Sequence, residues 1–455
     1  MQASTQVAHW LRRSLTAGLD QAADGAQLLT KTIAWPAQRD VMPFSLQVLF
    51  YRFYMALLKL SIRILPFKQP RLFTGADSAL ALCDALAANG TKRLMIVTDA
   101  VLMKIGLVDP IKQRLEAAGV QVTIYDGVEP DPSVEQIEAG VTQVKADQAE
   151  AILAIGGGSS IDAAKVIAAR ATNNKPIRRM EGLFRVFRRP LPLHAIPTTA
   201  GTGSEVTIAA VVSDLERQKK MSIIDLKLAP VTACLDGKLM AGLPPGVTAA
   251  TGMDALTHAV EAYISRNALK RTDTEALEAT RLIMEHLPKV MADGNNIESR
   301  QQMAQASYQA GIAFTQAGVG YVHAISHNFG ARYHTPHGLG NAIVLPHVLE
   351  FSKSACTERL ADLARVSGLD NDGAGSAELA DRFIQRIRDM NAEFGIPTGL
   401  EALQDADVPA IAKAAMAEAH FTYAVPRYMD RPTCEAFVRS LKLDPQPDRT
   451  TAQAA

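Results

Sequence analysis

The sequence of 455 residues has few of the features that mark secreted or membrane-spanning proteins. Its four cysteines, Cys83, Cys234, Cys356 and Cys434, lie far apart and form no CxxC pair. This spacing predicts neither a disulfide scaffold nor a thiolate zinc site, and it is typical of a reducing compartment. No stretch of about 20 residues is apolar and free of charge, and the first 30 residues lack a secretory signal. These absences favour a cytoplasmic protein.

The sequence also lacks a net charge, because 47 Lys and Arg residues balance 47 Asp and Glu residues. Proteins that bind nucleic acid usually carry a basic excess, so the balance argues against such a partner. The charges are nevertheless unevenly distributed. Residues 1–75 contain nine basic and three acidic residues, together with both tryptophans and nine of the 25 aromatic residues. The amino-terminal part therefore differs in composition from the rest of the chain.

Apolar runs and helical patterns alternate from residue 72 onward. Runs at 94–97, 120–125, 151–155, 193–197 and 231–235 predict strands, and one helix is expected to follow the first run as far as about residue 118. Such alternation indicates βαβ units and a parallel sheet. Beyond about residue 245 the pattern becomes helical. We expect an amino-terminal extension (1–71), an α/β dinucleotide-binding domain (72–243) and an all-helical domain (244–455).

Residues 151–162 read as a buried strand that runs into three glycines and then a helix. Glycines let the backbone approach a ligand closely, and the first N–H groups of the helix can bind a phosphate. The stretch lacks the GxGxxG spacing of a dinucleotide fingerprint. An ordinary tight turn, with Asp162 in the first turn of the helix, is therefore the alternative.

Two further segments are candidates for the same cofactor. Residues 197–207 are dense in hydroxyl and small side chains directly after a strand, which suits hydrogen bonds along a cofactor or an ordinary polar loop. Asp99 ends the run that begins at residue 94. An acid at such a place can bind the ribose hydroxyls of adenosine and repel a 2′-phosphate. A helix N-cap is the alternative role for Asp99.

Half of the ten histidines lie within residues 323–347. His323 and His327 are four residues apart, as are Asp254 and His258, so each pair shares one face of a helix. The helix that carries the second pair is expected to begin near residue 251, and His337 is expected in a turn. Together these residues can form a compact site for a divalent metal such as iron or zinc. A lone histidine on a helix is more often a hydrogen-bonded core residue, which is the expectation for His286, His347 and His420.

Four blocks of the sequence resemble the iron-containing (group III) alcohol dehydrogenase family. In order along the chain, they are residues 156–162, 197–206, 248–263 and 323–338. The resemblance covers residues 72 to about 440 and leaves residues 1–71 outside it. It implies an α/β N-terminal nucleotide-binding domain plus an all-α C-terminal metal-binding and catalytic domain, as in iron alcohol dehydrogenases and dehydroquinate synthases, here with a helical N-terminal extension.

The resemblance also implies roles for individual residues. It assigns a divalent metal, iron(II) in preference to zinc, to Asp254, His258, His323 and His337, and it makes His327 the catalytic histidine that faces the substrate. It assigns NAD to a larger set: Asp99, Asp131, Gly157, Gly158, Ser159, Asp162, Thr198, Thr199, Thr202 and Lys220. Asp131 stands where relatives commonly have Asn, so it places an additional negative charge near the cofactor.

The implied activity is a metal-dependent, NAD-linked alcohol dehydrogenase that interconverts a primary alcohol and its aldehyde by hydride transfer, as a homodimer. One alternative is a hydroxyacid–oxoacid transhydrogenase of the same family, in which a second substrate recycles the bound nicotinamide. The other is a peripheral membrane scaffold with a degenerate dehydrogenase body. The intact ligand set and glycine loop argue against the scaffold.

The apolar segment at residues 45–65 lies outside the resemblance. It contains 15 apolar residues among 21, and Arg52, Lys59 and Arg63 fall on one narrow stripe of a helix. A helix of this length, about 30 Å, is long enough to cross a bilayer, but three basic residues make crossing costly. We expect an amphipathic helix that contacts a membrane surface or packs against the catalytic domain or a second subunit. A cleaved targeting segment is a third alternative.

Overall fold

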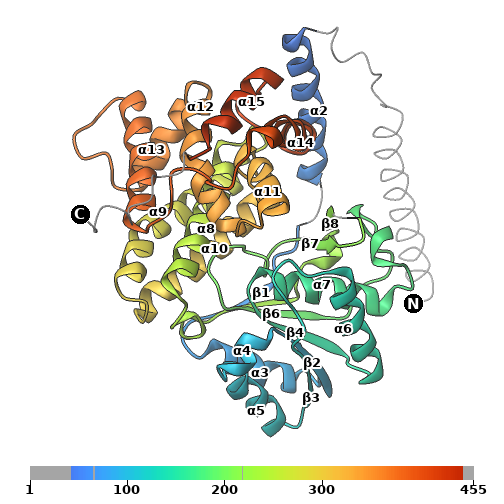
Figure 1. The fold of residues 1–455 in the computed structure, drawn as a ribbon. Helices are drawn as coiled ribbons and strands as arrows, with labels where there is room; N and C mark the ends of the chain where they lie inside the picture. Colours follow the sequence, from blue (N-terminus) through green and yellow to red (C-terminus); the bar gives the residue numbers. More distant parts are fainter. Residues whose placement is uncertain (1–42, 65–66, 218, 444–455) are drawn as a thin grey trace, which may run out of the picture.

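The structure is a computed structural model, and it describes residues 43–64, 67–217 and 219–443. Figure 1 shows a parallel sheet flanked by helices in the first half of these residues, and a body of helices in the second half. The predicted α/β domain followed by an all-α domain is therefore confirmed. The division at residues 243 and 244 stays a prediction, although the described chain changes from strands to long helices between Leu235 and Pro245.

The main sheet has the strand order β1-β9-β6-β4-β2-β3, and all its strands are parallel. Adjacent residues of β2 face opposite sides of the sheet, so Met95 packs under α6 and α7 while Ile96 packs with α3 and α5. β4 and β6 are buried at every position, as expected for a sheet covered on both faces. The strands are β1 (Arg71–Thr74), β2 (Arg93–Val97), β3 (Gln121–Tyr125), β4 (Ala151–Gly156), β6 (Leu193–Pro197) and β9 (Thr232–Leu235).

The helices of this half correct one prediction. The single helix expected to run to about residue 118 is wrong, because the chain forms two helices separated by a turn in which Gly106 has a φ of +72°. A left-handed residue cannot continue a right-handed helix. The helices are α3 (Ser78–Ala88), α4 (Ala100–Lys104), α5 (Asp109–Ala117), α6 (Val134–Ala146) and α7 (Gly158–Thr172).

A small second sheet, in the order β5-β8-β7, packs beside α7. β7 (Ala209–Asp214) and β8 (Lys219–Ile224) form an antiparallel pair, and β5 (Gly182–Leu183) adds to β8. Two short 3-10 helices, η2 (Ile177–Arg179) and η3 (Leu226–Leu228), connect these strands to the rest of the domain, and a third, η4 (Gly237–Met240), lies between β9 and the first long helix of the second half. β8 carries Lys220, which is one of the residues predicted to bind NAD.

The helical half is built around α8, which packs against α9, α10 and α12 and is buried along most of its length. α8 begins at Pro245, six residues before the expected start near residue 251, because proline suits the first turn of a helix. The helices are α8 (Pro245–Ile264), α9 (Lys270–Ala292), α10 (Ile297–Ala317), α11 (Tyr321–Tyr333), α12 (His337–Val366), α13 (Ser376–Glu393), α14 (Val408–Thr422) and α15 (Arg431–Ser440). A one-turn 3-10 helix, η5 (Asp405–Asp407), precedes α14.

The helix expected at residues 45–65 is present as α2 (Phe44–Ile64), which lies beside α14 (Figure 1). Tyr51 and Met55 are buried in this contact, and the ring of Tyr51 lies 4.7 Å from that of His420. Lys59 Nζ donates hydrogen bonds to the carbonyl oxygens of Arg266 and Ala268. α2 therefore packs on the catalytic domain through one face. No helix in the described part of the chain is both long and apolar enough to cross a membrane.

Candidate metal centre and cofactor cleft

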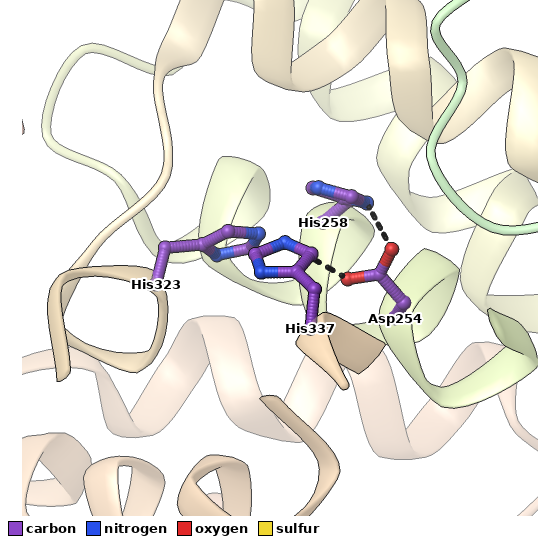
Figure 2. A group of neighbouring side chains, drawn as sticks. All are labelled: Asp254, His258, His323 and His337. Atoms are coloured by element: carbon purple, nitrogen blue, oxygen red, sulfur yellow. Dashed lines mark ion pairs between the residues drawn. The ribbon is translucent and has the colours of Figure 1, made fainter. Parts of the chain in front are cut away.

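Three helices bring the predicted metal ligands together (Figure 2). Asp254 and His258 come from successive turns of α8, His323 comes from the start of α11, and His337 is the first residue of α12. One ligand atom of each residue lies within 4.8 Å of the others. The Asp254 carboxylate faces both His258 and His337, at 4.0 Å and 3.7 Å. The sequence-based grouping of these four residues thus corresponds to one compact cluster.

The approach of α12 to α8 places His337 in the cluster. The sequence predicts that His337 lies in a turn. This is wrong, because His337 is the first residue of α12 and directly follows Pro336. The next residue, Gly338, lies so close to α8 that a Cβ would fall 2.3 Å from the carbonyl oxygen of Ala250. Only glycine permits this contact, since a side chain would force the helices apart.

Hydrogen bonds orient two of the ligand rings. Glu261 accepts hydrogen bonds from the backbone N–H of Val322 and from His323 Nδ1, at 2.8 Å and 2.6 Å. His258 Nδ1 lies 3.3 Å from the carbonyl oxygen of Gly201, to which it donates. A histidine that donates through Nδ1 keeps its Nε2 lone pair for a metal, and such supporting contacts typically fix ligand orientation.

Burial also favours the metal-binding protonation state. Desolvation lowers the pKa of His258, holds the pKa of His323 well below its usual value and lowers the pKa of His337 to about 4. The imidazoles are therefore neutral at pH 7, as metal ligands must be. Burial raises the pKa of Glu261 to about 8, and a cation nearby would oppose that shift because it stabilises the carboxylate.

The donor geometry fits a divalent cation. The Nδ2 atom of buried Asn341 lies 2.7 Å from Asp254 Oδ1 and 3.2 Å from Nε2 of both His323 and His337. An amide group has two N–H donors and cannot satisfy three acceptors, whereas a cation can accept electron pairs from all of them. Asn341 Oδ1 has no hydrogen-bond partner among the described residues. One carboxylate and three imidazoles suit iron or zinc.

His327 lies at the rim of this cluster, one turn after His323 on α11. Its ring stacks on His337, with centroids 5.3 Å apart and an interplanar angle of 16°. Its Nδ1 atom lies 2.8 Å from Glu418 Oε1. The side chain is 37% exposed, whereas that of His323 is 4% exposed. His327 thus lies beside the predicted ligands and, like His337, is partly accessible to solvent.

The two predicted cofactor loops touch at the carboxyl ends of β4 and β6, which pair through Gly156 and Pro197. Gly157 precedes the first residue of α7, and the described residues supply no side-chain cap there. A Cβ on Gly158 would lie 2.7 Å from the side chain of Thr202. The open N–H groups at the start of α7 therefore lie against the hydroxyl loop, in the usual position for a phosphate.

Two acids predicted to bind NAD have protein partners. Asp162 accepts hydrogen bonds from Ser204 Oγ and the backbone N–H of Val211, so it anchors the hydroxyl loop. Asp131 Oδ1 lies 2.7 Å from Lys220 Nζ, and the Asp131 N–H donates to Ser159 Oγ. The additional negative charge of Asp131 is therefore paired with the lysine predicted to reach the cofactor.

Asp99 caps α4, which was its alternative role. Its Oδ1 atom accepts hydrogen bonds from the N–H groups of Val101 and Leu102, both at 3.0 Å. Both bonds use one oxygen of the carboxylate. The cap fixes the side chain at the end of β2, one strand away from the glycine loop, which is where a ribose-binding acid stands in parallel sheets of this kind.

The hydroxyl loop connects the cofactor side to the metal side. Gly201 supplies the carbonyl oxygen that holds His258. Gly203, with a φ of +59°, packs against α10, where a Cβ would lie 2.8 Å from the Cα of Gly311. Thr198 is buried, and its N–H donates to the Gly156 carbonyl oxygen. Thr199 continues the same loop beside Gly157. The hydroxyl loop therefore lies between the predicted cofactor residues and the predicted metal residues.

Three residues of the site were missed in the sequence. Glu261 lies three residues after His258, and Asn341 lies four residues after His337, so helical periodicity could have identified both. Glu418 lies 91 residues from His327, and no local pattern connects them.

The fold and the site agree with comparisons to known proteins. Residues 69–237 match the family model described as iron-containing alcohol dehydrogenase, and residues 248–441 match that of the C-terminal part of the same family. NAD-dependent methanol dehydrogenase of Bacillus methanolicus is 41% identical over 349 residues, which cover 76% of this chain and 92% of that protein. The chain belongs to the iron-containing alcohol dehydrogenase family.

Further relatives support this membership. The 1,3-propanediol dehydrogenase of Klebsiella pneumoniae is 38% identical over 78% of this chain and 94% of its own length. A crystal structure of 1,3-propanediol oxidoreductase superposes with a TM-score of 0.80 at 36% identity, over 83% of this chain and all of that one. The predicted family, fold and alcohol dehydrogenase activity are confirmed, and the predicted combination of NAD and iron is supported. The transhydrogenase and scaffold alternatives are not favoured.

Proposed function

We propose that this dehydrogenase interconverts a primary alcohol and its aldehyde with NAD, and that Asp254, His258, His323 and His337 hold iron(II). The observation that carries the proposal is the convergence of these ligand atoms beside a hydroxyl-rich loop that continues to the glycine loop. A nicotinamide cofactor seated on both loops would thus reach the metal centre.

Different residues of the chain bind the different parts of the cofactor. When bound, a divalent cation supplies a Lewis acid that lowers the pKa of an alcohol hydroxyl, and NAD supplies the hydride acceptor. Gly157, Gly158 and Ser159 bind the pyrophosphate at the start of α7, and Asp99 binds the adenosine ribose. Thr198, Thr199 and Thr202 line the cofactor along the hydroxyl loop. Lys220 and Asp131 form the opposite border, and Asp162 fixes the loop.

His327 accepts the alcohol proton in this proposal. It lies beside the ligand cluster without belonging to it, and its side chain is 37% exposed, so it can pass a proton outward while the ligand rings remain neutral. Its position against His337 places it at the substrate end of the cleft.

A series of primary alcohols of increasing chain length tests the activity on iron-loaded enzyme. We expect NADH formation with primary alcohols and the reverse reaction with their aldehydes. Longer alcohols are expected to have higher kcat/KM, in line with the apolar amino-terminal part. Absence of NADH with every alcohol would contradict the proposal, and turnover of a hydroxyacid with an oxoacid in the absence of free NAD would indicate a transhydrogenase.

A second role is favoured by the outer face of α2. Leu46, Leu49, Phe53, Leu57 and Leu60, spaced by three or four residues, are 49% to 65% exposed. Residues 41–76 contain five basic and no acidic residues. Soluble monomers seldom expose such a continuous apolar face. We propose that α2 is an amphipathic helix that places this face on an anionic membrane surface.

Sedimentation with vesicles tests the membrane contact. Wild-type protein is expected to sediment with vesicles that contain phosphatidylserine and to stay in solution with phosphatidylcholine alone. Leu49→Ser with Phe53→Ser should abolish sedimentation. The control, Val101→Ser with Ile105→Ser, removes two similarly exposed apolar residues, one in α4 and one directly after it, and should behave as wild type. Wild-type protein that does not sediment with the phosphatidylserine vesicles would refute the contact.

We also propose that the protein is cytoplasmic and forms a homodimer. The four cysteines are buried and unpaired, as in a reducing compartment. The homodimer rests on resemblance to the family, and a molar mass from light scattering tests it.

A further inference from the structure

Two carboxylates hold two histidines of α11 in the same way. Glu261 of α8 accepts from Nδ1 of His323, and Glu418 of α14 accepts from Nδ1 of His327. The first pair is buried and orients a metal ligand, whereas the second lies at the edge of the cleft, with side chains 28% and 37% exposed. His327 is not one of the four proposed metal ligands, so Glu418 acts on His327 itself and not on a metal ligand.

We infer that Glu418 is a positioning residue that fixes the orientation and tautomer of His327. The inference rests on the proposed function, in which His327 accepts the alcohol proton. An ionised carboxylate only accepts hydrogen bonds, so the 2.8 Å contact places the ring proton on Nδ1. Nε2 is then the unprotonated nitrogen and the one able to accept a proton.

Glu418 is itself held in place. The Tyr423 hydroxyl donates a hydrogen bond of 2.6 Å to Oε1, the oxygen that also accepts from His327. Burial alone would raise the pKa of Glu418, but the hydrogen bonds from His327 and Tyr423 bring it below its usual value. The carboxylate therefore stays ionised at neutral pH, as an acceptor for Nδ1–H must.

A second contact fixes α14 relative to α11. The Tyr321 hydroxyl, six residues before His327 on α11, lies 2.7 Å from Nε2 of His420, two residues after Glu418 on α14. Tyr321 also accepts a hydrogen bond from the backbone N–H of Met429. Because α14 is bound to α11 at both places, Glu418 has little freedom to leave His327.

A merely structural ion pair would have different consequences. Pairs exposed to this extent contribute little to stability, so removing one should leave both folding and catalysis nearly unchanged. A positioning residue should instead affect kcat, because the wrong tautomer cannot accept the proton.

Glu418→Leu tests the inference, with Glu418→Gln as the conservative variant. We expect kcat to fall about 10- to 100-fold in Glu418→Leu, with KM for alcohol and for NAD changed less than about threefold and iron content unchanged. Glu418→Gln keeps an acceptor oxygen and should recover most of the loss. Lys413→Leu exchanges an exposed charge on the same helix and should match wild type. Wild-type kcat in Glu418→Leu, loss of iron from it, or an equal loss in Lys413→Leu would overturn the inference.

Nitrogen-15 NMR of the zinc-loaded enzyme gives a readout independent of activity. The His327 signal, assigned by its absence in His327→Gln, should show a protonated Nδ1 and an unprotonated Nε2. Glu418→Leu should move the ring toward the opposite tautomer. An unchanged tautomer would overturn the inference even if kcat fell. If wild-type enzyme forms no NADH from alcohols, the proposed function fails, while the tautomer still tests Glu418.

Discussion

At the scale of single residues, two contacts orient each of two histidine rings in the proposed metal centre. In this centre, His323 keeps Nε2 for the cluster while Nδ1 contacts Glu261, and His258 likewise contacts the Gly201 carbonyl oxygen through Nδ1. The second contact decides which nitrogen faces the cluster and keeps it unprotonated. The chemistry of the site is therefore set as much by carboxylates and a backbone carbonyl as by the ligands.

Cofactor choice is a prediction at this scale. Asp99→Asn should lower the preference for NAD over NADP at least about tenfold, measured as the ratio of kcat/KM values, because it removes the charge that repels a 2′-phosphate. Asparagine also caps helices well, so α4 should keep its start. Asp109→Asn, in the first turn of α5, is the matched control and should leave the ratio unchanged. A ratio unchanged in Asp99→Asn would remove the assigned role of Asp99.

The site residues that could be predicted from the sequence are those spaced at the period of a helix, because they share one helix face. Asp254 with His258, and His323 with His327, are pairs at a spacing of four, and the structure places each pair on one helix face. Glu418 could not be predicted, because its partner is brought to it by tertiary packing alone. The pairing of Asp131 with Lys220 was hidden for the same reason.

At the scale of elements, the loop at residues 197–207 connects the predicted cofactor residues with the predicted metal residues. It leaves β6, contacts the glycine loop through Thr202, and reaches α8 and α10 through Gly201 and Gly203. Beneath it, the buried Lys165 donates to Ser204 and Thr207 and to the Ala209 carbonyl oxygen. A rigid loop of this kind keeps the cofactor and metal sites in register.

Gly203→Ala tests that role. The residue has a φ of +59°, and a new Cβ would meet backbone atoms of Gly311 and Ser307 at 2.8 and 2.9 Å, which cannot move aside like a side chain. We expect a loss of about 2 kcal/mol or more in stability, seen as a lower urea midpoint, together with lower activity. Gly246→Ala, where a Cβ meets nothing within 4 Å, should be neutral or slightly stabilising. Equal midpoints for the two variants would contradict this account of the loop.

Elements with continuous apolar runs could be read from the sequence, and others could not. The five strands predicted between residues 94 and 235 are present, with ends shifted by at most one residue. β7 and β8 were missed because they alternate buried and exposed positions beside polar residues, including two lysines in β8. The break between α4 and α5 depends on one left-handed glycine, which a helical pattern does not reveal.

At the scale of the whole molecule, the sheet half and the helical half each contribute one side of the proposed active site. The glycine loop and Lys220 belong to the first, and the four proposed metal ligands belong to the second. α2 adds a basic, apolar helix to the back of α14, the helix that carries Glu418. Three of the nine basic residues counted in the amino-terminal part thus belong to this helix.

The metal content of His258→Ala tests the central claim most directly. We predict one iron per chain in the wild-type enzyme, and in the variant less than about a tenth of this, with loss of alcohol-dependent NAD reduction but retained NAD binding. The variant lacks one of the four proposed ligands, so the metal loses one of the coordinate bonds that hold it. His347→Ala, which alters a histidine that contacts the Thr398 carbonyl oxygen far from the cluster, should keep both iron and activity. Stoichiometric iron and full activity in His258→Ala would contradict the account.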